Sequence, residues 1–306
     1  MIEPTLDALD ERLRTLGVPG AHRRRVVAEA RDHLEELSVA TDPETAVARF
    51  GDVDEVARLV AAELATAATR RAAFDTFGAL ALVGIAFAGA LELVPLAGGW
   101  PDVFAGRISA LGPVVAIALV VLSQVAFVSG CLAALRAVRI RGAGAVSGAE
   151  LSLLRRRSAV ALLAGAGTLA ALAAFALDDR GLLAGWWVDG TLAASVLILV
   201  PVALAGARLV LAARPAAQPG GAPGDVFDDL APVFALEPVR RLALPEHPWR
   251  FALLTAAAVA LAGTFAGWVA EGDVASGFVR GGFEAIALLV CFSLLGRTLG
   301  LRRSPR

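Results

Sequence analysis

The side chains that could carry out chemistry are few and scattered. Histidine occurs at His22, His33 and His247, and cysteine at Cys131 and Cys291. None of them stands at the spacing of a zinc-protease helix, a paired-metal site or a nucleophile elbow. Both cysteines lie inside apolar runs, where we expect neither a disulfide framework nor a thiolate metal site. The sequence therefore predicts no catalytic residue, no metal site and no cofactor, and indicates a protein that is not an enzyme.

Two carboxylates in apolar segments are the best candidates for a polar site. Glu92 and Glu284 each lie near the outer end of a predicted membrane span. An ionisable residue within a span marks a ligand or proton site, whereas a carboxylate at the interface can simply reach water. Glu92 and Glu284 are thus a candidate outer-interface polar site, and solvated interface carboxylates are the plainer interpretation.

The elements that hold these carboxylates are long apolar runs. The chain is 57% hydrophobic and 19% charged, with a mean hydropathy of +0.69, whereas soluble proteins carry about 25% charged residues. A helix crosses the hydrocarbon core with about 20 apolar residues. Six segments meet this requirement, and the last is the weakest because Glu284 and Arg297 flank it: 77–97, 108–135, 159–177, 190–207, 251–270 and 281–301. Residues 71–306 are therefore predicted to form a six-helix transmembrane bundle in membrane lipid.

Arginine placement predicts the orientation of this bundle, because short cytoplasmic loops are rich in basic residues. One side collects most of the loop arginines, and the other side holds Arg107, Arg180 and Arg280 among several acids. The five tryptophans fall at or close to span ends, as an aromatic belt requires. We expect a multi-pass protein of the bacterial cytoplasmic (inner) membrane with both termini in the cytoplasm.

Residues 1–70 have a different composition and predict a small acidic helical domain. Leucines recur at Leu6, Leu9, Leu13 and Leu16, the spacing of one helix face. Further helices are expected over 21–37, from Asp42 and Pro43 onward, and from Asp52 onward, which gives about four helices and an all-α fold class. The first 69 residues hold fourteen acids against eight arginines. Such a surface repels phosphate, so direct nucleic-acid binding is not expected.

Several exposed positions are candidate interaction residues. Arg23, Arg24 and Arg25 form the one basic cluster of the acidic domain, and His33 lies on a charged helix face. A solvated helix surface is the plainer interpretation of both. The cytoplasmic loop at 212–249 opens with a Pro, Gly and Ala-rich linker. Phe227 and Phe234 then fall on the apolar side of a short amphipathic helix, which we expect to pack on the N-terminal domain or the bilayer.

The N-terminal domain resembles the HAAS signalling domain family. The similarity rests on Leu9 to Leu16 followed by Pro19, on ValValAlaGluAlaArgAspHisLeuGluGluLeu at 26–37, and on AspProGluThrAlaValAlaArgPheGlyAspValAspGluValAlaArg at 42–58. Phe50 stands where the family pattern favours Leu. The resemblance implies a cytoplasmic helical module on multi-span bacterial membrane proteins, with a signalling role and often a neighbouring PadR-like transcription regulator. It implies no catalytic residues.

The functional hypothesis is a non-enzymatic integral membrane regulator or sensor. The uninterrupted helical stretch from Leu59 to Phe77 would couple the bundle to a cytoplasmic protein partner, for which a PadR-like regulator is one candidate. A homo-oligomer is also compatible with the sequence. The alternative is a membrane component of a transporter or efflux permease, because similar helical domains precede the spans of some permeases.

Overall fold

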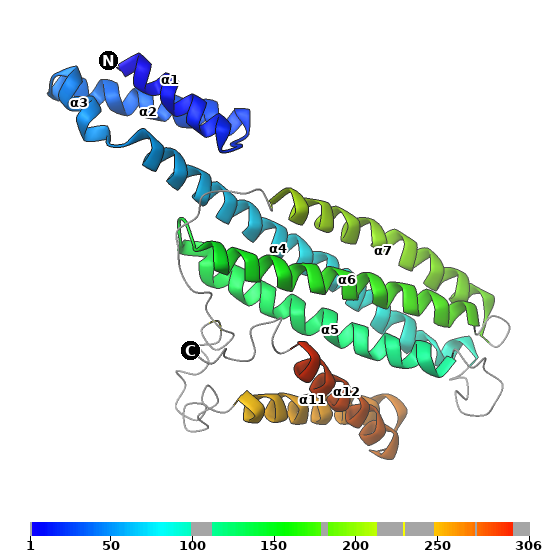
Figure 1. Ribbon diagram of the computed structural model, residues 1–306. Coiled ribbons are helices and arrows are strands. Elements are labelled where there is room, and N and C mark those ends of the chain that lie inside the picture. The colour runs from blue at the N-terminus through cyan, green and yellow to red at the C-terminus, as the bar shows by residue number, and fades with distance from the viewer. Residues whose placement is uncertain are drawn as a thin grey trace. The chain divides into compact units, whose positions relative to one another are not determined.

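The structure is a computed structural model that describes residues 2–98, 112–178, 183–212, 229, 248–272 and 274–295. Over these residues it is built from helices, as the sequence predicts (Figure 1). The chain divides into two compact units. The first comprises Met1–Arg71, Ile140–Ser152 and Val210–Pro223, and the second comprises Ala72–Arg139, Leu153–Leu209 and Gly224–Arg306.

The first unit contains the predicted acidic domain. Helices α1 (Ile2–Thr15), α2 (Gly20–Ala40), α3 (Pro43–Phe50) and the first turns of α4 (Val53–Leu93) surround one apolar core. The α1 leucine stripe lies at its centre, with Leu9 and Leu13 fully buried. Helix α1 starts at Ile2, so Thr5 lies inside the helix and does not cap it. Proline is tolerated in a first helical turn, which allows Pro4 there.

Helices α3 and α4 start where the sequence predicts, after Asp42 and after Asp52. Asp42 caps α3 by accepting hydrogen bonds from the Glu44 and Thr45 amides at 3.0 and 2.9 Å. The Thr45 hydroxyl also donates to this carboxylate, and these bonds lower the pKa of Asp42 because they favour its charged form. Gly51 ends α3 with φ of 87°, a value that glycine adopts without strain. Asp52 then accepts from the Asp54 amide at the start of α4.

Helix α4 contributes residues to both cores without a break (Figure 1). Ala57 and Ala61 belong to the core of the acidic domain, and Ala90 belongs to a core of the second unit. Between these positions α4 is also hydrogen-bonded to the segment that follows α5. The Arg70 guanidinium donates to the Arg141 carbonyl at 2.8 Å, and the Val146 amide donates to the Thr66 hydroxyl at 3.3 Å.

In the second unit, α4 packs with three other long helices, α5 (Gly112–Arg139), α6 (Gly148–Asp178) and α7 (Gly185–Ala212). Leu80 of α4 lies over two glycines, with its methyl carbons 2.6 and 2.7 Å from where a Cβ would stand on Gly130 and Gly165. The two helices α5 and α6 therefore hold this leucine only because neither position carries a side chain.

Five described helices are long and apolar enough to cross a membrane: α4, α5, α6, α7 and α11 (Pro248–Glu271). Each overlaps one of the first five predicted spans, although α4 and α6 begin well before the spans predicted at 77–97 and 159–177. Their surfaces are covered with large apolar side chains, and Ile85, Leu163 and Val196 are each at least 69% exposed. An apolar surface this extensive suits lipid and not water.

The sixth predicted span corresponds to α12 (Val274–Leu295), which is displaced toward the N-terminus from the predicted 281–301. Residues 296–301 lie outside the described part of the chain. That this helix crosses the bilayer remains a prediction. Helix α12 starts after the turn at Gly272 and contains Arg280, which stands just before the first residue of the predicted segment.

Helices α11 and α12 form a hairpin that depends on glycine. Gly277 and Gly281 of α12 are four residues apart and so share one helix face. A Cβ on Gly277 would lie 2.8 Å from the Trp268 amide nitrogen, and one on Gly281 would lie 2.8 Å from the Thr264 nitrogen and still closer to the Ala260 carbonyl. The two backbones therefore approach as they do in small-xxx-small pairs of membrane helices.

A side chain at Gly281 should separate this hairpin. Gly281→Leu should destabilise the protein by about 1–3 kcal/mol, because the neighbours of Gly281 include backbone atoms of Ala260 and Thr264 that cannot turn aside. Gly282→Leu is the matched control, since nothing lies within 4 Å of a Cβ at that position. Thermal unfolding of the purified protein in detergent measures both. Equal melting temperatures for the two variants would contradict the close packing.

Candidate functional site

A buried cluster of charges lies where α5 and α6 meet Asp229 within the second unit. The Asp229 carboxylate accepts from Arg136 Nε and Nη2, each at 2.9 Å, and from Arg157 Nη1 at 2.8 Å. Arg139 Nη1 lies 3.4 Å from the same carboxylate. The side chains of Asp229, Arg136 and Arg157 are 0% exposed. We call these four residues the arginine–aspartate cluster.

The geometry of this cluster joins three segments that are far apart in the sequence. Arg136 forms a two-nitrogen fork on Asp229, which fixes orientation as well as distance. Arg157 also donates to the Leu132 carbonyl at 3.1 Å, so α6 is bonded to both α5 and Asp229. Burying an ion pair is costly in itself, but removing one partner of a buried pair costs more because an uncompensated charge remains. The cluster is therefore a structural constraint on the position of Asp229.

The sequence signal for this cluster was present but was assigned to another role. In the sequence, Arg136 and Arg157 indicate only the orientation of the bundle. The acids of the 212–249 loop indicate only that its helix contacts a protein surface and not anionic lipid. The Asp229 carboxylate contacts arginines of α5 and α6, and the packing of the loop helix on the N-terminal domain or the bilayer stays a prediction. Phe227 and Phe234, the other candidates of this loop, lie outside the described residues.

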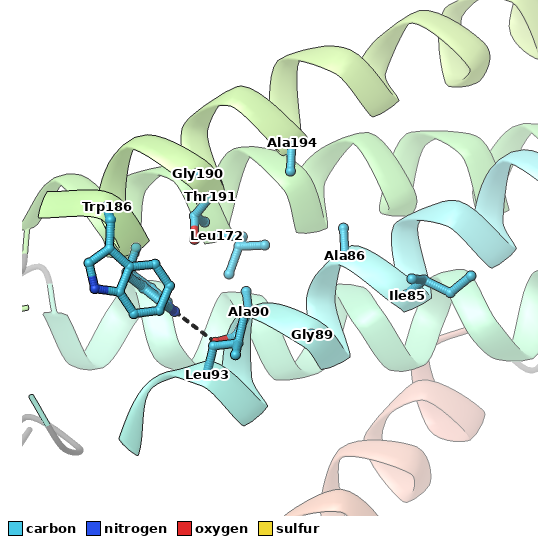
Figure 2. Close-up of a pocket in the computed structure, with 11 residues that line it drawn as sticks. Ile85, Ala86, Gly89, Ala90, Leu93, Leu172, Trp186, Gly190, Thr191 and Ala194 are labelled. Atoms are coloured by element: carbon cyan, nitrogen blue, oxygen red, sulfur yellow. Dashed lines mark hydrogen bonds between the residues drawn. The ribbon is translucent and has the colours of Figure 1, made fainter. Parts of the chain in front are cut away.

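Two cavities open among the apolar helices of the second unit. The smaller, of about 300 Å³, is lined by α4, α6 and α7. Figure 2 shows Trp186 and Leu93 at one end of it and Ala194 toward the other. Trp187 closes its wall by donating from Nε1 to the Ala90 carbonyl at 2.9 Å, and Phe175 packs edge-on against the same indole. This cavity has Thr191 as its one polar side chain among the described lining residues, so it is a packing feature of the tryptophan belt.

The larger cavity, of about 680 Å³, brings Glu284 together with Ser123, Gln124 and Thr168. Glu92 is exposed in the last turn of α4 and is not among the described residues that line either cavity. Glu284 lies ten residues into α12, and its predicted place near the outer end of a span stays a prediction.

The surface of the acidic domain presents the remaining candidates. His33 is exposed on α2, beside exposed Asp32. In the basic cluster, Arg23 pairs with Asp10 at 2.7 Å and Arg25 with Glu29 at 2.8 Å, and the latter bond raises the pKa of Arg25. Arg24 is exposed. Two of the three predicted interaction arginines thus pair with acids of the domain itself.

No group of His, Cys, Asp and Glu that could hold a metal ion occurs among the described residues. The geometry of the described sites provides buried ion pairs, one carboxylate in an apolar cavity and an exposed helix surface. These arrangements can hold segments together, bind a ligand or bind a protein.

The helices of the acidic domain and their caps also define a known family. Residues 6–58, from the α1 leucine stripe to the first turns of α4, match the HAAS family model. This domain belongs to the HAAS family. The resemblance read from the sequence is thereby confirmed, and it extends over the HAAS domain and not over the apolar helices. No curated protein and no solved structure matches the chain.

On the HAAS domain, one face of α2 combines charge with an apolar side chain. Asp32, Glu35, Glu36 and Val39 are spaced three and four residues apart and share this face. All four are exposed, and Val39 is 89% exposed. Among the described residues, none of the three carboxylates forms an ion pair. We call these four residues the α2 face.

The arginine–aspartate cluster should contribute far more to stability than a surface pair. Asp229→Ala should cost about 3–5 kcal/mol, because it leaves buried arginines without their carboxylate. The control is Asp75→Ala, which removes the partner of Arg208 at 2.8 Å from a pair that is 37% and 64% exposed. That change should cost less than about 1 kcal/mol. Thermal unfolding of both variants in detergent measures the difference, and similar losses would show that Asp229 is not buried as described.

Proposed function

We propose that this chain is a non-enzymatic membrane regulator or sensor whose HAAS domain binds a cytoplasmic protein and reports the state of the membrane bundle to it. The observation that carries the proposal is α4, one helix of 41 residues that contributes to the core of the HAAS domain and to a core of the apolar unit. A change in the packing of the bundle would reach the HAAS core along this helix, because a continuous helix transmits rotation and tilt.

The α2 face supports a protein partner. The HAAS match identifies a protein-interaction module, and Val39 gives this face an apolar centre next to three carboxylates. An apolar residue bordered by charges is the pattern of a small transient interface. A partner with a basic and apolar patch fits this surface, and a PadR-like transcription regulator is the candidate that the family suggests.

Site-specific photocrosslinking in cells tests the partner directly. A crosslinking residue at Glu36 of the full-length chain should capture a transcription regulator, and one at exposed Ala8 of α1 should not. The double variant Asp32→Arg with Glu35→Arg should reduce the Glu36 crosslink at least tenfold, since like charges repel a basic patch. Both substitutions are on the surface and should change stability by less than about 0.5 kcal/mol.

The outcomes separate the two functional classes. Equal yields from Glu36 and Ala8, or a Glu36 crosslink unaffected by the charge reversal, would contradict a partner on the α2 face. Capture of an ATPase subunit in place of a transcription regulator would support the second candidate, a component of a transporter or efflux permease. That candidate is favoured by one observation, the large cavity that contains Glu284.

A further inference from the structure

Gln124 is the one amide side chain among the described residues that line the large cavity of the second unit. It lies twelve residues after the start of α5 and fifteen before its end. At 1.5 Å per residue these positions are about 18 Å and about 22 Å away along the helix. Since the hydrocarbon core of a bilayer is about 30 Å thick, α5 holds this amide far from water. A polar group at that depth needs a partner in the protein or in a ligand.

The protein itself does not supply this partner. Among the described residues, the partly buried side chain of Gln124 forms no hydrogen bond. Its amide carries two N–H donors and a carbonyl oxygen that accepts. An amide left unsatisfied in apolar surroundings is costly. Gln124 is therefore the group of this cavity that a ligand would satisfy.

The two hydroxyls of the cavity can only accept. The Ser123 hydroxyl donates to the Val120 carbonyl at 2.8 Å, and the Thr168 hydroxyl donates to the Ala164 carbonyl at 2.9 Å. Each hydroxyl hydrogen is used within its own helix, so each oxygen has only acceptor capacity left. The cavity thus offers donors on Gln124 and acceptors on Gln124 and both hydroxyls. A matching head group both donates and accepts hydrogen bonds.

The charges near the cavity favour a neutral head group. No basic residue lines the cavity among the described residues, so an anion would lose its hydration without a cation to compensate it. Glu284 also lines the cavity, but it has an interaction of its own within the protein. Its carboxylate therefore does not call for a cationic ligand.

The rest of the lining is mainly apolar and reaches the surface of the apolar unit. Phe77, Ile85 and Phe127 line the cavity and are 44%, 69% and 66% exposed. Large apolar side chains on the surface of span-length helices suit lipid, so a ligand enters from the bilayer. The cavity volume of about 680 Å³ is that of a site for a drug-sized molecule, which suits a lipid with a single chain.

We propose that this cavity binds a neutral single-chain lipid whose head group both donates and accepts hydrogen bonds, as a primary amide or a hydroxyl does. The head group pairs with the Gln124 amide and with a neighbouring hydroxyl oxygen, and the chain lies among the apolar side chains. This site stands apart from the proposed partner contact, because ligand binding is measurable whether or not the HAAS domain binds a protein.

Equilibrium binding of oleamide to the full-length protein in lipid nanodiscs tests the site, with partition into empty nanodiscs subtracted. Methyl oleate is the matched probe, because it has the same chain and an ester that accepts but cannot donate. Saturable binding of oleamide is expected, at least tenfold tighter than that of methyl oleate. Gln124→Leu should remove most of this preference, since leucine neither donates nor accepts.

A second variant keeps Gln124 and fills the cavity. Gly84 lines the cavity, and nothing lies within 4 Å of a Cβ at that position, so a side chain enters without a clash. Gly84→Leu should weaken binding of both probes at least tenfold. Gly89→Leu is the matched control, because Gly89 of the same helix is equally open and lines the smaller cavity. It should bind oleamide as the unchanged protein does.

Each outcome decides the proposal. Equal affinity for oleamide and methyl oleate, or an unchanged preference in Gln124→Leu, would overturn the assignment of the head group. Tighter binding of oleylamine or of oleate than of oleamide would overturn its neutrality. Unchanged binding in Gly84→Leu would place the lipid elsewhere. Oleamide binding that does not exceed partition into empty nanodiscs would overturn the site altogether.

Discussion

The backbone amides and carbonyls of α4 need hydrogen-bond partners in two media, water and lipid. In the HAAS domain, water can replace a broken backbone hydrogen bond on the exposed side of α4. In lipid, every amide and carbonyl needs a partner within the segment. An uninterrupted helix is the simplest solution for a chain that passes from one medium to the other. The sequence permits it because neither proline nor glycine occurs from Val53 to Phe77. The same continuity gives the HAAS core a stiff connection to the apolar unit.

Two acidic residues of the apolar unit have contrasting surroundings among the described residues. Asp229 is enclosed by Arg136 and Arg157 with short, directed hydrogen bonds. Glu284 instead lines the large cavity. The two arrangements serve different ends. The first holds Asp229 against two helices, and the second places a carboxylate beside Ser123, Gln124 and Thr168 in an otherwise apolar cavity.

The sequence predicted the features that depend on local pattern. The Asp42 cap with Pro43, the leucine stripe of α1, the HAAS resemblance and five apolar helices are encoded by neighbours a few residues apart. The arginine–aspartate cluster was not predictable in this way, because its residues are 72 and 93 positions apart and their pairing depends on tertiary packing. The start of α12 at Val274 was not predicted, because the apolar run that marks a span begins only after Arg280. The small-xxx-small spacing of Gly277 and Gly281 could have predicted the close packing of α12 from the sequence.

Coupling through α4 is the central claim, and a single proline tests it. Ala68 is exposed on α4, so Ala68→Pro breaks the helix between the two cores by removing an amide donor and clashing with the preceding turn, whereas Ala68→Gln keeps it. The measurement is the photocrosslink yield from His33 in full-length variants whose HAAS domain resists protease as the unchanged protein does. We predict that the proline variant changes the yield severalfold and that the glutamine variant does not. The same yield in both variants would contradict transmission along α4.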